Sequence, residues 1–301
     1  MEGLIFVAGG TGFMGRRLID ALAKRGRKVR CLVRTPAKAK ICTQAGHEVV
    51  SGDITDRESL RGKLEGVETV VHLVGIITER AAGQTFESVH VKGTQNLIEE
   101  AKSAGVKHFF YQSALGANLH SWAKYQKTKA EAEELVKASG IPYTIFRPSL
   151  VVGGDDGFIS RLKDIILAPS PVIPIPGAGK AKFQPIYVGD WLECFLRMLD
   201  NPDALGKTYE LGGPEHLTYK RMVEEVAKAM GSVKPMIHIP IMLVKFSAPI
   251  LGLATYEQIR LLEADNITDP EAVKKGFGFE PMRFSDALKI FLKEGAGSPA
   301  G

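Results

Sequence analysis

Tyr125 and Lys129 stand four residues apart in the run Tyr125-Gln-Lys-Thr-Lys129, at the start of a predicted helix. That spacing places both side chains on one face of the helix. A tyrosine phenol has an ordinary pKa of about 10, which is too high for a base at neutral pH. A neighbouring ammonium would stabilise the phenolate and can also bind a ribose hydroxyl. The pair therefore predicts an acid–base site in which Tyr125 moves a proton and Lys129 tunes it.

Ser113 follows the fifth predicted strand, upstream of Tyr125 in the chain. Its hydroxyl would donate to a substrate carbonyl oxygen and so polarise the carbonyl for hydride transfer. A Tyr-x-x-x-Lys spacing alone is common in lysine-rich helices. Here it is more specific, because a glycine-rich loop, described next, precedes it in the chain. We predict that Ser113, Tyr125 and Lys129 form the catalytic set.

A glycine-rich loop joins a strand predicted over residues 4–8 to a helix predicted over 14–25. Glycine lets the chain turn tightly, lets the backbone approach a pyrophosphate, and lets the helix pack closely on its strand. The amides at the amino end of the helix then point at the anion. The loop predicts a dinucleotide site with contacts from Gly9, Thr11, Gly12, Phe13, Met14 and Gly15.

The end of the second predicted strand bears on the choice between NAD and NADP. An acidic residue there binds the ribose 2′-hydroxyl and repels a 2′-phosphate. This chain has Arg34 at that point and no carboxylate before Glu48. We therefore expect NADP(H), with NAD(H) as the alternative. Asp53 and Ile54, after the third strand, are expected at the adenine, and capping of the next helix is the alternative role for Asp53.

Strands and helices alternate along the first half of the chain, which is the pattern of βαβ units on a parallel sheet. Strands are expected over 4–8, 29–33, 47–51, 69–74, 109–112 and 143–147, and helices over 14–25, 56–64, 86–104 and 122–139. Farther on, 153–157 and 169–176 are predicted as loops, 184–188 and 208–211 as strands returning to the sheet, 217–230 as a helix and 236–240 as a strand.

The pattern predicts an α/β protein with a Rossmann-type, doubly wound parallel sheet and a smaller, discontinuous C-terminal lobe. We expect the NAD(P)-binding domain over 1–152 and 183–212. The substrate or partner lobe would cover 153–182 and 213–294, and residues 295–301 would form a flexible tail.

Composition narrows the class of protein. The chain has no unbroken apolar run of about 18 residues, so a membrane span is not expected. Its three cysteines are scattered and lack metal-ligand spacing, so neither a disulfide framework nor a metal site is expected. With no signal peptide recognised, we expect a cytoplasmic protein. The formal charge of +5 is dispersed, which suits an anionic small ligand and does not predict nucleic-acid binding.

The segment 237–254 is unusually apolar for a C-terminal lobe. One interpretation is a helix that caps the substrate pocket. The alternative is a peripheral contact surface for a membrane or a protein complex, which would also shape a pocket for a lipophilic substrate. Two prolines and Lys245 argue against a membrane span.

The sequence resembles the short-chain dehydrogenase/reductase superfamily, in its extended and atypical branches. The resemblance rests on Gly9–Gly15, Gly52-Asp53, Val71-His72-Leu73, His90-Val-Lys-Gly-Thr-Gln-Asn96, Tyr125 with Lys129, and Arg147-Pro148-Ser149. More narrowly, the chain is similar to the branch that contains the nucleotide-binding accessory subunit of mitochondrial respiratory complex I and its bacterial relatives. This closer likeness rests on Leu32-Val33-Arg34, Gln112-Ser113-Ala114-Leu115-Gly116-Ala117, Phe183-Gln-Pro-Ile-Tyr-Val-Gly-Asp190 and Thr208-Tyr-Glu-Leu-Gly-Gly213.

The resemblance implies a Rossmann core, NAD(P)(H) binding and the Ser/Tyr/Lys set at the nicotinamide end. It also implies backbone contacts to the nicotinamide from Pro148, Ser149 and Leu150, which join Val74 and Gly75 in the predicted cofactor site. Extended epimerases usually carry His-Leu-Ala-Ala after the fourth strand, where this chain has His72-Leu73-Val74-Gly75. This departure puts a sugar-nucleotide substrate in question.

Two functions follow from these features. The first is an oxidoreductase or epimerase that acts on the carbonyl or hydroxyl group of a small molecule by Tyr–Lys-assisted hydride transfer. The alternative is a non-catalytic NADPH-binding accessory or assembly factor for a respiratory or membrane complex.

Overall fold

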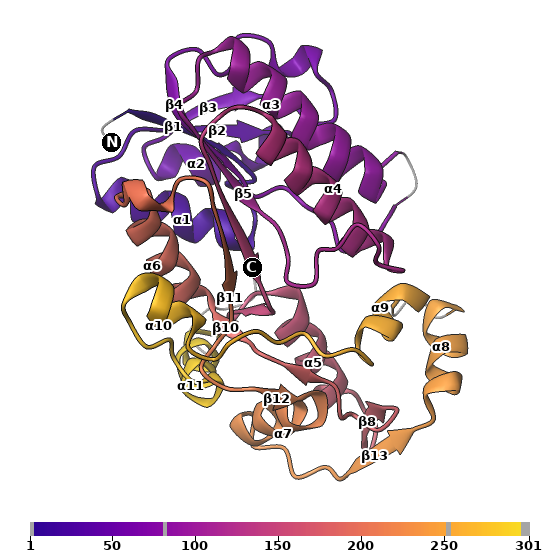
Figure 1. The fold of residues 1–301 in the computed structure, drawn as a ribbon. Coiled ribbons are helices and arrows are strands. Elements are labelled where there is room, and N and C mark those ends of the chain that lie inside the picture. Colours follow the sequence, from indigo (N-terminus) through magenta and orange to yellow (C-terminus); the bar gives the residue numbers. More distant parts are fainter. Residues whose placement is uncertain (1–2, 81–82, 251–253, 296–301) are drawn as a thin grey trace. The chain divides into compact units, whose positions relative to one another are not determined.

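The computed structural model describes residues 3–80, 83–250 and 254–295 (Figure 1). The chain divides into two compact units. The first is made of the chain up to Arg147 together with Leu192–Tyr209, and the second of Pro148–Trp191 together with the chain from Glu210 onward. We describe each unit by itself.

A seven-stranded sheet forms the centre of the first unit, in the order β11-β6-β5-β4-β1-β2-β3. Neighbouring strands from β1 to β6 pair in parallel. The chain order reverses between β1 and β4, and ligands of such sheets bind beyond the carboxyl ends of the strands at that point. The strands are β1 (Leu4–Ala8), β2 (Val29–Val33), β3 (Glu48–Ser51), β4 (Val67–His72), β5 (His108–Gln112), β6 (Tyr143–Pro148) and β11 (Lys207–Leu211).

Helices cover both faces of this sheet (Figure 1), as in a doubly wound fold. Strand β5 shows why: Phe109 and Tyr111 join the core cluster formed with α3 and α4, whereas Phe110 packs on Phe195 of α6. Because side chains alternate along a strand, both faces must be apolar. The helices are α1 (Phe13–Lys24), α2 (Ala39–Gln44), α3 (Gly93–Ser103), α4 (Lys124–Ala138) and α6 (Val188–Leu199), with 3₁₀ turns η1 (Pro36–Lys38), η2 (Glu58–Leu60) and η4 (Pro202–Ala204). This confirms the predicted fold class.

A π-helical turn, η3 (Glu87–Lys92), runs directly into α3. The sequence analysis expected one regular helix over 86–104. A π-turn holds one more residue than an α-turn, and such turns are frequent at functional sites. The hydroxyl of Thr94, at the start of α3, donates back to the carbonyl oxygen of His90 in the π-turn at 2.5 Å.

Three two-stranded sheets and six helices surround the core of the second unit in its described part. Its buried cluster brings together side chains from α5, α7 and α11. The pairs are β7 (Val151–Val152) with β10 (Ile186–Tyr187), β9 (Lys182–Phe183) with β12 (Leu217–Thr218), and β8 (Ile173–Pro176) with β13 (Met236–Ile239). The helices are α5 (Gly157–Leu167), α7 (Tyr219–Ala229), α8 (Ile241–Ile250), α9 (Tyr256–Leu261), α10 (Ala272–Phe277) and α11 (Phe284–Gly295).

Several predicted elements were wrong. The helix expected over 56–64 is only the turn η2, because Gly62 and Gly66 adopt positive φ and end it. The proline-rich stretch 169–176, expected as a loop, contains β8, whose Ile173 and Ile175 are buried against β13. The strand expected over 184–188 does not return to the large sheet, because Ile186–Tyr187 pairs with Val151–Val152.

The pairing of β7 with β10 also bears on the boundary between the two units. Residues 148–152, 183–191 and 210–212, assigned to the nucleotide-binding domain from the sequence, group with the second unit. The short β7–β10 pair joins Val151–Val152 to Ile186–Tyr187 within that unit. Of the predicted tail, Gly295 ends α11 and the remainder lies outside the described residues.

Candidate functional site

The glycine loop connects the carboxyl end of β1 to α1, beside the reversal of strand order (Figure 1). Gly9 has a φ of +95°, which other residues rarely adopt, and a Cβ there would lie 3.2 Å from the backbone of Leu73 and Val74. A Cβ on Gly15 would collide with the Gly9 carbonyl oxygen and lie 2.7 Å from the Cα of Gly10. The close approach of α1 to the loop therefore requires glycine at position 15, and the close approach of the loop after β4 requires glycine at position 9.

Helix α1 begins with its amides available to a ligand. Gly12 is the N-cap, and within the described chain no side chain caps this end or places an acid in its first turn. Backbone amides and the helix dipole at such an end attract an anion. Thr11, Phe13 and Met14 are half-buried around it and Gly12 is exposed. The arrangement can cradle a pyrophosphate, and the cofactor contacts expected from the spacing stay a prediction.

Arg34 and Asp53 lie beside each other at the carboxyl ends of β2 and β3. The Arg34 guanidinium is 3.5 Å from the Asp53 carboxylate, and its side chain is mostly exposed. The other carboxylate oxygen of Asp53 accepts from the amide and hydroxyl of Thr55, both at 2.9 Å. Arg34 is therefore accessible to a phosphate, whereas one carboxylate oxygen of Asp53 is already hydrogen-bonded to Thr55 in the same turn. Ile54 is buried against Gly93, where a Cβ would lie 2.6 Å from its Cδ1.

The loop after β4, which carries Val74 and Gly75, is clamped by a buried histidine. The hydroxyl of Thr128 donates to the carbonyl oxygen of Lys124, so it accepts from Nδ1–H of His90 at 3.0 Å. Nε2 of His90 then accepts from the amide of Ile76 at 3.1 Å. Burial and the Lys129 charge lower the pKa of His90 to about 2, so it stays neutral. His90 is therefore a clamp rather than an acid or base.

Tyr125 and Lys129 lie on one face of α4, as their spacing predicted. The Tyr125 ring packs edge-on against Phe86 and His90, with centroids 5.8 and 5.6 Å away. The Lys129 ammonium is buried, donates to the carbonyl oxygen of Gln112 at 2.8 Å, and lies 3.1 Å from where a Gly75 Cβ would be. The β4 loop therefore runs directly over the lysine.

Burial shifts the pKa values of both members of this pair. It raises the pKa of Tyr125 to about 12. Burial also lowers the pKa of Lys129 to about 8, partly opposed by the carboxylate of Glu133. At neutral pH, Tyr125 is therefore a phenol and Lys129 is an ammonium.

Ser113 lies at the end of β5 but is turned into a buried ion pair. Its hydroxyl donates to Oε1 of Glu133 at 2.5 Å. The Arg147 guanidinium holds the same carboxylate with two hydrogen bonds, at 2.8 and 2.6 Å. The single proton of Ser113 is thus committed within the protein. A donation to substrate, which stays a prediction, would require breaking this bond.

The sequence analysis missed Glu133 and Thr128. Glu133 comes one helical turn after Lys129 and is fully buried, where it partners Arg147. A charged residue continuing the face of Tyr125 and Lys129 was the available signal. Thr128 gave no comparable signal, because its role depends on His90, which is far away in sequence.

Pro148, Ser149 and Leu150 belong to the second unit. The Ser149 hydroxyl donates to Asn266, with oxygens at 2.8 and 2.7 Å, and its amide donates to the carbonyl oxygen of Leu211. The Leu150 carbonyl accepts from Ile186. Their contacts to a nicotinamide stay a prediction.

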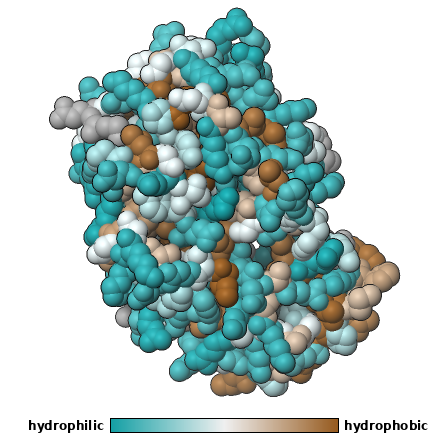
Figure 2. All heavy atoms as spheres, in the orientation of Figure 1, coloured by the Kyte–Doolittle hydropathy of each residue, from teal (hydrophilic) through white to brown (hydrophobic). Residues whose placement is uncertain are grey.

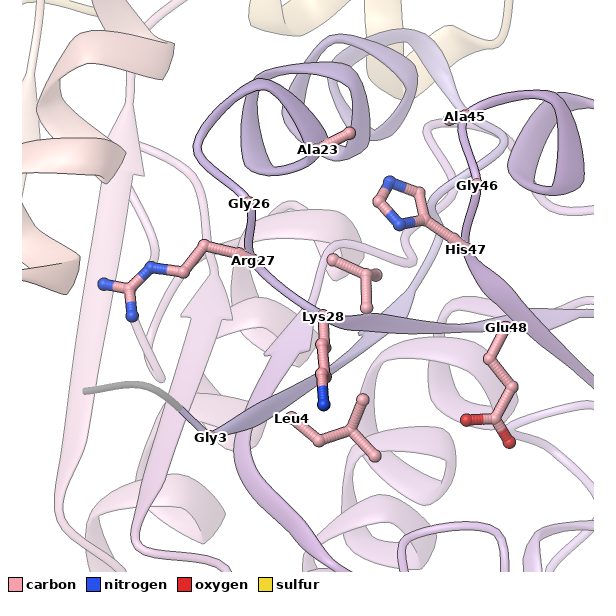
Figure 3. Close-up of a pocket in the computed structure, with 11 residues that line it drawn as sticks. Gly3, Leu4, Ala23, Gly26, Arg27, Lys28, Ala45, Gly46, His47 and Glu48 are labelled. Atoms are coloured by element: carbon pink, nitrogen blue, oxygen red, sulfur yellow. The ribbon is translucent and has the colours of Figure 1, made fainter.

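A hollow of about 750 Å³ opens on the first unit, lined by Leu4, Val29 and Glu48 at the amino ends of three strands (Figure 3). The glycine loop lies at the carboxyl end of β1, so this hollow is at the opposite edge of the sheet and is not the dinucleotide site. Among the residues that the structure describes, no group of three His, Cys, Asp or Glu side chains is arranged to hold a metal ion.

Comparison with known proteins agrees with this geometry. The family model described as NAD(P)H-binding matches residues 9–163. The chain is 29% identical to NADH dehydrogenase (ubiquinone) 1 alpha subcomplex subunit 9, mitochondrial, of Arabidopsis thaliana, over 89% of this chain and 71% of that protein. It is also 29% identical to sterol demethylase protein B of Methylococcus capsulatus, over 96% of this chain and 98% of that protein.

Among solved structures, an NADPH-dependent quinone oxidoreductase from Escherichia coli superposes with a TM-score of 0.76 at 22% identity, over 96% of this chain and 99% of that one. At this identity the likeness shows the fold alone. The family match spans about half of the chain and includes the glycine loop, Tyr125 and Lys129. The chain therefore belongs to the NAD(P)H-binding family.

Proposed function

We propose that the chain is an NADP(H)-dependent oxidoreductase that reduces the carbonyl group of a lipophilic small molecule. The observation that carries the proposal is the pairing on α4 of a protonated phenol, Tyr125, with the buried ammonium of Lys129. An epimerase would need to remove as well as return a proton and a hydride. At neutral pH Tyr125 holds its proton, which is the state that a carbonyl reduction needs at its start.

The residues present fit a nicotinamide dinucleotide. Gly9 and Gly15 leave no room for a Cβ, so the backbone forms the floor of an anion cradle at the start of α1. Exposed Arg34 is the cation for a 2′-phosphate, which favours NADP(H) over NAD(H). When bound, the reduced nicotinamide supplies a hydride to the carbonyl carbon.

The chain's own residues then manage the proton. Hydride addition leaves negative charge on the former carbonyl oxygen, and the Tyr125 hydroxyl gives its proton to that oxygen, which yields an alcohol. Lys129 stays an ammonium below its pKa of about 8 and stabilises the phenolate left on Tyr125. His90 keeps the β4 loop in place without titrating.

Apolar side chains support a lipophilic substrate. Exposed Ile77 lies in the loop after β4, and exposed Leu119 and Trp122 lie in the loop after β5. These two strands are neighbours in the sheet, so both loops start at the edge where Tyr125 is held.

The test uses Tyr125→Phe. We expect NADPH to bind by calorimetry as in the unchanged chain, whereas NADPH oxidation with quinones, aldehydes and ketones falls by at least about 100-fold. Loss of binding and turnover together would show only a damaged fold. If the unchanged chain oxidises NADPH with none of these compounds while binding it tightly, the proposed reaction is wrong.

A second candidate is a non-catalytic NADPH-binding accessory or assembly factor, in contact with a respiratory or membrane complex through 237–254. Two observations favour it: the commitment of Ser113 to Glu133, and the exposed apolar side chains of α8. Co-purification of a membrane complex with the chain, lost on deleting 237–254, would support it. The cytoplasmic location expected from the sequence stays a prediction under either function.

A further inference from the structure

Helix α8 turns apolar side chains toward solvent. Phe246 and Ile250 are 73% and 81% exposed, and Met242 and Leu243 are also exposed. At 100° per residue, these four positions fall within a sector of about 100° on the helix. Ala248, on the opposite side, is buried. The helix therefore has a continuous apolar stripe on the side where a surface helix normally carries polar residues.

The stretch around α8 lacks negative charge. The sequence has no Asp or Glu between Glu225 and Glu257, but it has three lysines there. Lys228 is exposed, and Lys245 flanks the apolar stripe, where its ammonium pairs with Glu263 at 2.6 Å. The stretch that holds the apolar face therefore has no acid of its own, and the acid at its edge, Glu263, is neutralised by Lys245. Such a face suits the surface of a lipid bilayer, which is apolar inside and polar or anionic outside.

Tyr256 adds an interfacial side chain. It is exposed at the first position of α9, and the Lys245 ammonium lies 5.9 Å from its ring centroid. Tyrosine at the edge of an apolar stripe matches the level of lipid headgroups, since it has an apolar body and a polar tip. The Lys245 side chain is 15% exposed, and its ammonium stays paired with Glu263 at the edge of the stripe where Tyr256 lies. Figure 2 shows apolar residues gathered on α8, at the lower right of the view.

We propose that the apolar face of α8 inserts into the headgroup layer of an anionic lipid bilayer, with Tyr256 and Lys245 at its edge. The proposal rests on the 237–254 contact suggested above but not on nucleotide binding or turnover. It makes the chain a peripheral membrane protein. A lipophilic substrate would dissolve in the same bilayer, so the chain would encounter it there.

A bilayer fits better than a second copy or a protein partner. A standard protein interface takes about 20–30 residues from each side, whereas this face offers a few side chains of one ten-residue helix. A bilayer needs only a few inserted side chains, because lipids deform around them. None of the described helices is long and apolar enough to cross a membrane, so the helix would lie in the surface.

The test is co-sedimentation of the full chain with vesicles of phosphatidylcholine alone or mixed with phosphatidylglycerol. We expect binding to the mixed vesicles, reduced by salt. F246E and L243E should each lower the bound fraction by at least about ten-fold, because they replace an inserted apolar side chain with a charge. The matched control is L205E, which places the same charge on an exposed leucine of the first unit.

Three results would overturn the proposal. The unchanged chain could stay in the supernatant with both kinds of vesicle, or F246E could sediment as well as L205E. Light scattering could also show a dimer that F246E dissociates, which would make the stripe a self-association surface. NADPH calorimetry on the same samples keeps the tests separate, since F246E should bind NADPH as the unchanged chain does.

Discussion

The hydroxyl of Ser113 lies 2.5 Å from Oε1 of Glu133, and the Arg147 guanidinium donates to both oxygens of the same carboxylate. The serine that the sequence suggested for carbonyl polarisation is thus joined to a buried ion pair. The next carbonyl back, that of Gln112, accepts from the Lys129 ammonium. Two hydrogen bonds therefore connect the end of β5 to α4, one from the neutral donor Ser113 and one from the charged donor Lys129. Both hold the helix that carries Tyr125.

Ser113→Ala separates the two roles of this serine. If Ser113 only fastens β5 to α4, the free energy of unfolding should fall by about 1 kcal/mol for the lost hydrogen bond, with turnover reduced less than about ten-fold. Urea unfolding and NADPH oxidation on one preparation measure both. A turnover loss of about 100-fold with unchanged stability would instead restore Ser113 as a direct donor to substrate.

Glu133→Gln should destabilise the first unit by about 3–5 kcal/mol, because it leaves Arg147 without its charge partner in a mostly buried position. Glu134→Gln is the matched control: Glu134 is the next residue of α4, pairs with Lys137 at 2.8 Å, and is more than half exposed. That change should alter stability by no more than about 0.5 kcal/mol. Equal effects from the two variants would contradict a structural role for the buried pair.

NADPH affinity should weaken as the pH rises through about 8, where Lys129 loses its proton. The groups facing Lys129 are Tyr111, His72, His90 and Glu133; burial keeps both histidines neutral, with pKa values of about 3 and 2, and raises the pKa of Tyr111. Lys129→Met should bind more weakly and lose this pH dependence in calorimetry. If the NADPH affinity of the unchanged chain stays the same across this pH range, the ammonium makes no contact with the ribose.

The same shift has an opposite effect on stability. The pKa of Lys129 falls from 10.5 in the unfolded chain to about 8 in the folded one. Between these values the unfolded chain binds more protons, so the contribution of Lys129 to the free energy of unfolding rises with pH. Thermal unfolding of Lys129→Met and the unchanged chain on either side of about pH 8 should show their difference in stability changing with that sign.

Gly15→Ala should abolish NADPH binding and destabilise the fold by about 1–3 kcal/mol, because the new Cβ collides with the Gly9 carbonyl oxygen. Gly157→Ala is a suitable control, since a Cβ there meets nothing within 4 Å and its φ is not positive. That change at the first position of α5 should leave binding intact. NADPH binding by Gly15→Ala with normal affinity would count against the glycine cradle.

Arg34→Ala should weaken NADPH binding by about ten-fold or more and leave NADH binding nearly unchanged, because only NADPH carries the 2′-phosphate. The guanidinium is exposed and held loosely by Asp53 at 3.5 Å, so its loss should not disturb the fold. Parallel titrations with the two dinucleotides decide the matter. Equal losses for both would show that Arg34 does not read the phosphate.

The sequence predicted the parts of the molecule that depend on local pattern. The six parallel strands, the glycine loop and the helix with Tyr125 and Lys129 each have a short-range signal, and the fold class and the family are confirmed. The direction of the Tyr125 pKa shift depends on burial, which residue spacing does not reveal. The fastening of Ser113 to Glu133 depends on contacts between distant segments, which the spacing of Tyr125 and Lys129 could not indicate.

The second unit was predicted less well for a similar reason. Its strands are only two to four residues long, and Ile173–Pro176 alternates prolines with buried isoleucines, so it looks like a turn until Met236–Ile239 is placed beside it. The segment with β10 carries signals for a sheet return, but its partner is the nearby β7. Local sequence pattern identifies strands, but it does not indicate which other strand each one pairs with.

The π-turn over Glu87–Lys92 limits how this region can change. An α-helix in its place would need one residue fewer, and removing one would rotate the preceding residues by about 100° relative to α3. His90 would then swing off Thr128 and Ile76, which it joins through opposite ring nitrogens. Deleting one residue from this turn should therefore be more harmful than many substitutions within it. The number of residues in the turn sets the direction in which the His90 imidazole points.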